Sequence, residues 1–112
     1  MNMENKSFFL NVDDELKDLG SGVYRKLLAR NEKLMTVEVY FEENAVGAIH
    51  SHPHDQISYI TEGEFEYNID GNKMIVKKGD SCIIEPNIPH GVNCLKKGML
   101  LDVFTPTRKD FL

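Results

Sequence analysis

The hydrophobic residues of this chain recur with a period of two far more often than with the 3.6-residue period of a helix. Alternation of this kind puts apolar side chains on one face of a β-strand and polar side chains on the other. The apolar runs are short and are separated by turn-forming residues, as at Asp70-Gly71-Asn72. Many short strands at regular spacing predict an all-β sandwich or barrel with little helix.

The order of the expected elements follows from the same pattern. A short N-terminal segment at residues 8–12 precedes one helical turn at 13–19, which the sequence Gly20-Ser21-Gly22 ends. Strands are expected at residues 23–29, 34–41, 48–52, 57–61, 64–69, 73–77, 81–85, 91–95 and 99–104. A chain of 112 residues can bury one core but hardly two, so residues 1–112 are expected to form a single domain.

Composition excludes several classes of protein. The 13 basic and 18 acidic residues give a net charge of −5, and the basic residues are scattered, which argues against a nucleic-acid partner. No apolar run approaches the roughly 20 residues that span a bilayer, and the N-terminus lacks the apolar region of a signal peptide. We therefore expect a cytoplasmic protein without a membrane partner. Cys82 and Cys94 have no CxxC spacing, and free, buried thiols are their simplest interpretation.

The histidines indicate a metal site. His50 and His52 at positions i and i+2 of a strand can point the same way and chelate one ion. His90 follows a turn and an apolar run, so a neighbouring strand could supply it to the same site. His54 has the parity of His52, but Pro53 is expected to end the strand between them. Neutral imidazole is the commonest protein ligand for divalent transition metals.

A carboxylate lies on an otherwise apolar strand near the C-terminus. Leu100, Asp102 and Phe104 share one face of this strand, and Asp102 needs a cationic or hydrogen-bonding partner if it is buried. Arg108 or the metal centre could be that partner. The opposite face is also apolar, so the N-terminal strands or a second subunit must cover it, and we expect a homodimer. The residues of that opposite face are Met99, Leu101 and Val103.

Two spaced motifs carry a family resemblance. The patterns His50-x-His52-x3-Gln56-x6-Gly63 and Gly79-Asp80-x5-Pro86-x3-His90 resemble the paired motifs of the cupin superfamily, with Gln56 in place of the usual glutamate. Two turn glycines of the family pattern are absent, one at Asn44 and one between Pro86 and His90. The resemblance covers roughly residues 34–104, which would form the barrel core. Strands at residues 8–29 would precede this core, and a short tail at 105–112 would follow it.

Within that superfamily, residues 50–59 and 101–111 most resemble the KdgF proteins of pectin and alginate breakdown. The resemblance implies a single-domain cupin β-barrel, or jelly roll, with one divalent metal (Ni, Zn, Fe, Co or Mn) held by His50, His52, Gln56 and His90. His54 remains an alternative ligand to Gln56. The resemblance also implies conversion of cyclic 4,5-unsaturated uronate monomers into their linear keto form. Asp102, Phe104 and Arg108 would then be the substrate-handling residues.

The residue chemistry is compatible with this reaction. Three neutral imidazoles and a neutral amide leave the full +2 charge on a bound ion, which makes it a strong Lewis acid for a small anionic sugar. Arg108 could clamp the carboxylate, and Asp102 is the candidate base. Burial raises the pKa of such a carboxyl and a nearby cation lowers it, so the direction stays open.

Two other function classes fit the same residues. An iron-bound site with three histidines could support a dioxygenase. A small barrel of this kind could also bind a sugar acid without catalysis. Cys94 could share the face of His90, although a buried, inert thiol is the simpler interpretation.

Overall fold

The computed structural model describes residues 6–112 and confirms the all-β expectation. Among these residues no α-helix occurs, and no helix is long and apolar enough to cross a membrane. The strands are β1 (Lys17–Gly20), β2 (Val23–Arg30), β3 (Met35–Phe41), β4 (Val46–His50), β5 (Asp55–Ile69), β6 (Asn72–Lys77), β7 (Ser81–Ile84) and β8 (His90–Thr105). Two short 3-10 turns, η1 (Asn11–Asp13) and η2 (Lys109–Phe111), lie near the ends of the chain.

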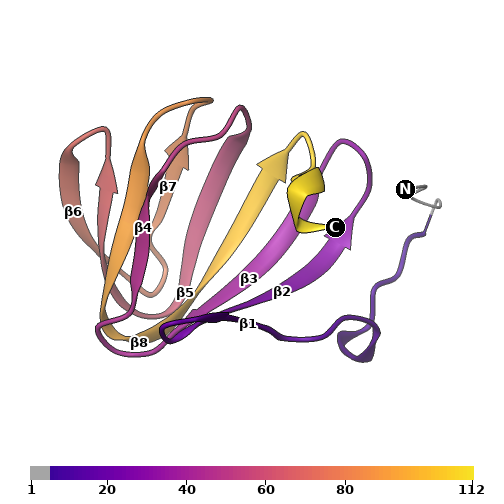
Figure 1. Ribbon diagram of the computed structural model, residues 1–112, viewed down its shortest axis with the longest axis horizontal. Coiled ribbons are helices and arrows are strands. Elements are labelled where there is room, and N and C mark those ends of the chain that lie inside the picture. The colour runs from indigo at the N-terminus through magenta and orange to yellow at the C-terminus, as the bar shows by residue number, and fades with distance from the viewer. Residues whose placement is uncertain (1–5) are drawn as a thin grey trace.

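All strand pairs are antiparallel, and the two longest strands organise the sheet. The path runs β1-β2-β3-β8-β5-β6, while β4 pairs with β8 and β7 pairs with β5. Figure 1 shows the strands curving around one another, with the C-terminal turn η2 close to the loop that joins β2 and β3. This arrangement is the jelly-roll barrel that the sequence predicts.

Strands β5 and β8 each replace two expected strands. The sequence suggested breaks at Gly63 and near Gly98, but both strands continue through these residues with shifts in register. A Cβ atom on Gly98 would lie 2.1 Å from the carbonyl oxygen of Glu62, and one on Gly63 would lie 2.5 Å from those of Lys96 and Lys97. The glycines therefore permit a close backbone approach at a bend, and the ladder is not interrupted.

The N-terminal region differs from the expectation. The predicted helical turn at 13–19 is wrong, because a 3-10 turn ends at Asp13 and β1 begins at Lys17. The N-terminal strands expected within residues 8–29 are β1 and β2, and the short segment at 8–12 contains no strand. Gly20, Ser21 and Gly22 all have positive φ and form the tight turn of a hairpin between β1 and β2. The glycines that suggested a helix end therefore reverse a strand.

Cross-strand register positions the interior side chains in rows. Phe104 lies between Met35 and Gln56, and Asp102 lies between Val37 and Ser58. Because neighbouring rows on one face are two residues apart, Gln56, Ser58, Asp102 and Phe104 all point into the barrel. The main core cluster consists of Val23, Phe41, Ala45, Ile60, Phe65, Tyr67, Val76, Ile84, Val92, Cys94 and Leu100. The polar interior residues lie between this cluster and a smaller one formed by Met35, Val37 and Phe104.

Candidate metal centre

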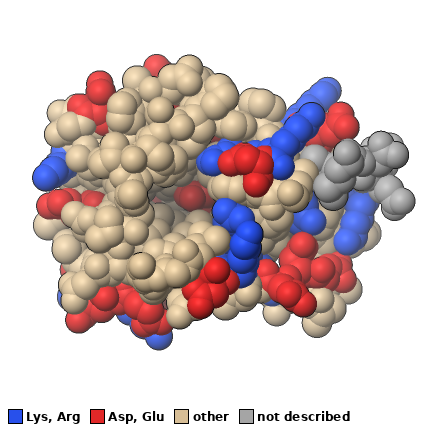
Figure 2. All heavy atoms as spheres, viewed as in Figure 1, with Lys and Arg blue, Asp and Glu red and all other residues tan. Residues whose placement is uncertain are grey.

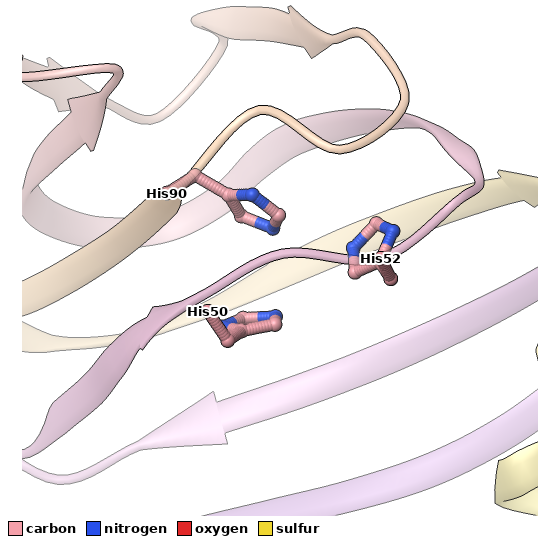
Figure 3. Close-up of side chains that lie close together, drawn as sticks. All are labelled: His50, His52 and His90. Carbon is pink, nitrogen blue, oxygen red and sulfur yellow. The ribbon is translucent and has the colours of Figure 1, made fainter.

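Three histidines converge from two strands and a connecting segment. His50 ends β4 and is the register partner of His90, which begins β8. His52 lies just beyond β4, so the expected strand at 48–52 ends two residues early. The ring centroid of His90 is 4.4 Å from that of His50 and 4.9 Å from that of His52. One nitrogen of each ring lies within 4.8 Å of the others, and Figure 3 shows the rings turned toward a common space. These histidines form a group that could hold a metal ion.

Backbone hydrogen bonds orient two of the rings. The Nδ1–H of His50 donates to the carbonyl of Ala48, and that of His90 donates to the carbonyl of Ile88, each at 2.8 Å. Both rings therefore carry the lone pair on Nε2. The Nε2 atom of His90 is buried without a hydrogen-bond partner among the residues described. A buried acceptor nitrogen in this position fits a metal ligand, because backbone-anchored imidazole is the usual arrangement at metal sites.

Burial keeps the rings of His52 and His90 neutral. It lowers the pKa of His52 to about 4, with a further contribution from the positive charge of Arg108. Burial also lowers the pKa of His90. Neutral imidazole is the form that donates a lone pair to a metal, so His52 and His90 do not have to lose a proton near neutral pH before an ion binds.

Gln56 adjoins the histidine group. Its Oε1 lies 3.0 Å from Nε2 of His52, while its amide nitrogen donates to the hydroxyls of Ser58 at 3.1 Å and Tyr67 at 3.4 Å. These bonds turn the carbonyl oxygen of the amide toward the histidines. His54 does not belong to the group within 4.8 Å, and its ring instead packs edge-on against His52 with a centroid distance of 5.3 Å.

A cavity of about 170 Å³ opens beside the histidines. Its lining includes His50, Gln56 and His90, together with all three expected substrate-handling residues, Asp102, Phe104 and Arg108. Figure 2 shows a hollow on this face with mostly uncharged walls, acidic atoms at its bottom, and Lys or Arg side chains along one side.

Asp102 is buried at the end of a chain of hydrogen bonds that runs from Gln56 through Ser58. The hydroxyl of Ser58 donates to its Oδ1 atom at 2.5 Å, so this carboxylate has a hydrogen-bonding partner, but it is Ser58 and not Arg108, which the sequence suggested. Burial raises the pKa of Asp102 to about 6, although Ser58, Gln56 and Arg108 each act in the opposite direction. Desolvation therefore outweighs the nearby cation.

Arg108 is held firmly at the cavity wall and is only 9% exposed. Its Nε and NH2 groups donate to the two carboxylate oxygens of Asp110 at 3.0 and 2.8 Å, and its guanidinium lies 5.1 Å from the ring centroid of Phe104. The preceding tail is tied to the β2–β3 loop, because Thr105 donates to the carbonyl of Lys33 at 2.7 Å and Thr107 donates to that of Asn31.

Sequence reasoning missed several residues of the site. Arg25 and Phe111 line the cavity, and Ser58 links Gln56 to Asp102. Tyr67, which the sequence could not rank against the other tyrosines, also lines the cavity. Strand parity was the available signal: Ser58 has the parity of Gln56, and Arg25 has that of the buried Val23.

The two cysteines are free thiols and neither lines the cavity. Cys94 belongs to the main core cluster, and burial raises its pKa. Burial raises the pKa of Cys82 to about 11, and Asp102 contributes in the same direction. Both groups are therefore protonated near neutral pH, as expected for inert thiols.

Comparison with known proteins identifies similar chains. The family model described as "Cupin domain" matches residues 37–104. The chain is 40% identical over 109 residues to the pectin degradation protein KdgF of Dickeya dadantii, covering 96% of this chain and 99% of that protein. An RmlC-like cupin from Shewanella frigidimarina has a TM-score of 0.91 at 39% identity, covering 96% of this chain and 97% of the other. KdgF from a Halomonas species has a TM-score of 0.90 at 36% identity, covering 96% of this chain and 100% of the other.

Proposed function

The chain belongs to the cupin domain family, and from this premise we propose that it catalyses the ring opening of 4,5-unsaturated uronate monomers to the linear keto sugar acid. Similarity to two KdgF proteins, one of them named for pectin degradation, supports this assignment over nearly the whole chain. The observation that carries the proposal is one cavity lined by two histidines of the metal group, a buried carboxyl and an arginine, namely His50, His90, Asp102 and Arg108.

The residues fit a divalent transition metal. We assign His50, His52, His90 and Gln56 as the groups that would hold it, and Gln56 is preferred to His54 because its oxygen lies 3.0 Å from Nε2 of His52. All four side chains are neutral, so a bound ion would retain its full positive charge and supply Lewis acidity for developing oxyanions. Nickel, zinc, iron, cobalt and manganese all suit these ligands.

Asp102 is the proposed general base. Ring opening removes the proton from the anomeric hydroxyl, breaks the bond between C1 and the ring oxygen, and leaves an enolate that takes a proton at C4 to give the ketone. A carboxyl with a pKa of about 6 is ionised near neutral pH and is still basic enough to accept a proton. The hydrogen bond from Ser58 fixes the orientation of the carboxylate, so one oxygen stays available for the substrate.

Phe104 and Arg108 are proposed to position the substrate. The Phe104 ring lines the cavity and would supply an apolar contact for the unsaturated sugar ring, while the guanidinium of Arg108 lies over the ring at 5.1 Å. Arg108 supplies positive charge at the wall where a uronate carboxylate would lie. An unsaturated uronate is a small anion, and the cavity carries Arg108 in a mostly uncharged wall and the carboxyl of Asp102 in its lining.

The test is loss of the ultraviolet absorbance of the conjugated C4=C5 double bond. Purified protein loaded with metal is compared with chelated protein and with a blank that lacks protein. Metal-dependent acceleration above the blank is the expected result, and Asp102→Asn should remove it while metal binding persists. No acceleration with a demonstrably filled site would reject the assignment. Oxygen uptake with iron would then favour a dioxygenase, and uronate binding without turnover would favour a non-catalytic sugar-acid-binding role.

Two further properties are proposed alongside this function. We place the protein in the cytoplasm, where a reducing environment suits two unpaired thiols. We also propose a homodimer, because the outward sides of β5, β7 and β8 carry Ile57, Tyr59 and Ile83 at 44%, 43% and 64% exposure next to Leu101 and Val103. Sedimentation analysis of the wild type and Ile83→Lys tests it, since the charge should produce monomers.

A further inference from the structure

Arg25 is a charged residue at an inward position of β2. Its neighbours of the same parity are Val23, which is buried, and Leu27, which packs against the smaller core cluster. The register partner of Arg25 on β3 is Val39, and both residues line the cavity. The Arg25 side chain is half-buried on an otherwise apolar, inward row, a position that favours a partner of opposite charge.

Phe111 brings the two arginines of the cavity together. The guanidinium carbon of Arg25 lies 3.9 Å from the ring centroid of Phe111, and that of Arg108 lies 4.2 Å from the same centroid. Contact with an aromatic ring holds a guanidinium in place while leaving its edge N–H groups available for hydrogen bonds. Two cations are thus positioned beside one phenyl ring at the wall of the cavity.

The two arginines differ in how their charge is neutralised. Asp110 occupies the guanidinium edge of Arg108 formed by its Nε and NH2 groups. Arg25 forms no ion pair and no side-chain hydrogen bond with another of residues 6–112. Burial and the neighbouring charge of Arg108 lower the pKa of Arg25, and the charge of Asp110 acts in the opposite direction without forming an ion pair with it. The guanidinium stays protonated at neutral pH. One positive charge in this wall therefore has no direct ion-pair partner among residues 6–112.

We propose that Arg25 binds the carboxylate of the sugar-acid substrate and sets the preference of the cavity for anions. The guanidinium of Arg25 can bind a carboxylate in two parallel hydrogen bonds, whereas one of the two edges of the Arg108 guanidinium is already occupied by Asp110. Arg108 then acts beside it, as a second charge packed on Phe104 and Phe111. This inference rests on the proposed function, because it names the residue that recognises the acid group of the proposed substrate.

Kinetics on the unsaturated uronate test the role of Arg25. Arg25→Gln should raise KM by about 10- to 100-fold with kcat nearly unchanged, because a charged hydrogen bond to the substrate is lost. Arg25→Lys should recover part of the affinity. Lys17→Gln is the matched control: Lys17 is the register partner of Arg25 on β1, is exposed and does not line this cavity, so KM should stay at the wild-type value. An unchanged KM in Arg25→Gln would overturn the inference.

A binding measurement separates this inference from the proposed reaction. Wild-type protein and the variants, each checked for melting temperature and metal content, are titrated calorimetrically with galacturonate and with its neutral methyl ester. The wild type should prefer the acid, and Arg25→Gln should lose that preference while keeping its affinity for the ester. An equal loss for acid and ester would overturn the inference, as would a wild type that does not prefer the acid. If the wild type prefers the acid without turnover of the unsaturated sugar, the ring-opening function fails and the assignment of Arg25 stands.

Discussion

Ser58 on β5 and Asp102 on β8 are register partners, and the Ser58 hydroxyl donates a hydrogen bond of 2.5 Å to the carboxylate. Because a hydroxyl has one proton, Ser58 must accept from Tyr67 at 2.8 Å and from the Gln56 amide at 3.1 Å. The donor direction is therefore fixed along the whole network. Gln56 must present its carbonyl oxygen, not its nitrogen, to the histidines.

Asp102→Asn should stabilise the metal-free protein near neutral pH. The pKa of Asp102 rises from 3.8 to about 6 on folding, so the native state holds this proton more tightly than the unfolded chain does. The stabilising effect of this proton is fully present below the pKa of Asp102 in the unfolded chain. It is lost as the pH rises through the pKa of Asp102 in the native state. At about pH 7 the ionised carboxylate costs up to roughly 3 kcal/mol, which the neutral amide avoids.

Urea unfolding of chelated wild type and Asp102→Asn over a pH series measures this effect. The stability gain of the variant should be largest near about pH 7 and should shrink steadily toward about pH 4. The histidines titrate in both proteins, so their contribution cancels in the difference. A gain that does not depend on pH would show that the pKa of Asp102 is not raised.

Ser58→Ala should weaken metal binding, because it removes the acceptor that orients the Gln56 amide. Loss of such an outer hydrogen bond lowers metal affinity by about 10- to 100-fold. Chelator competition measures the dissociation constant. Thr61→Ala on the same strand is the matched control, since it loses a hydroxyl bond of 3.0 Å to the carbonyl of Met99, away from the histidines. Equal affinity in the two variants would assign Ser58 a purely structural role.

Gln56→Glu should bind divalent metal more tightly and turn over substrate more slowly. The new carboxylate would cancel part of the charge of the ion, so turnover should fall on the order of a hundredfold. It would also place a second carboxylate beside Asp102, where the amide now donates to Ser58. In the metal-free state this repulsion should lower the melting temperature. Faster turnover in the variant would contradict the argument that a neutral ligand set serves catalysis.

The residues of this site that belong to a spaced motif or to the family resemblance were predicted from the sequence, and those that depend only on strand pairing were not. The His50-x-His52 spacing lies within one segment, so the metal group was predictable. Ser58 and Arg25 gain their roles only from register, because their partners Asp102 and Phe111 lie on distant parts of the chain. No local pattern specifies which strands pair, and parity alone does not say which face is inward.

The errors in the predicted fold also arise from strand pairing that the local sequence does not specify. The sequence predicts separate strands at residues 57–61 and 64–69, yet Gly63 allows one continuous strand, β5, to bend against β8. Gly20 and Gly22 were read as a helix end, although the polar run before them forms β1 by pairing with β2. In each case tertiary pairing decided between two structures that the local sequence allows.

Metal binding should stabilise the protein through His50 and not through His54. An ion at 100 times its dissociation constant adds about 2.7 kcal/mol to the free energy of unfolding, which raises the melting temperature of a domain of this size by roughly 10 °C. His50→Ala should abolish this rise, and since His50 is exposed, the truncation leaves the core intact. His54→Ala should retain it, because His54 lies outside the group of converging nitrogens. Thermal scans of chelated and zinc- or nickel-loaded protein provide the comparison. If His54→Ala lost the metal-induced rise while His50→Ala kept it, the ligand set would have to be reassigned to the His54 side of the cavity.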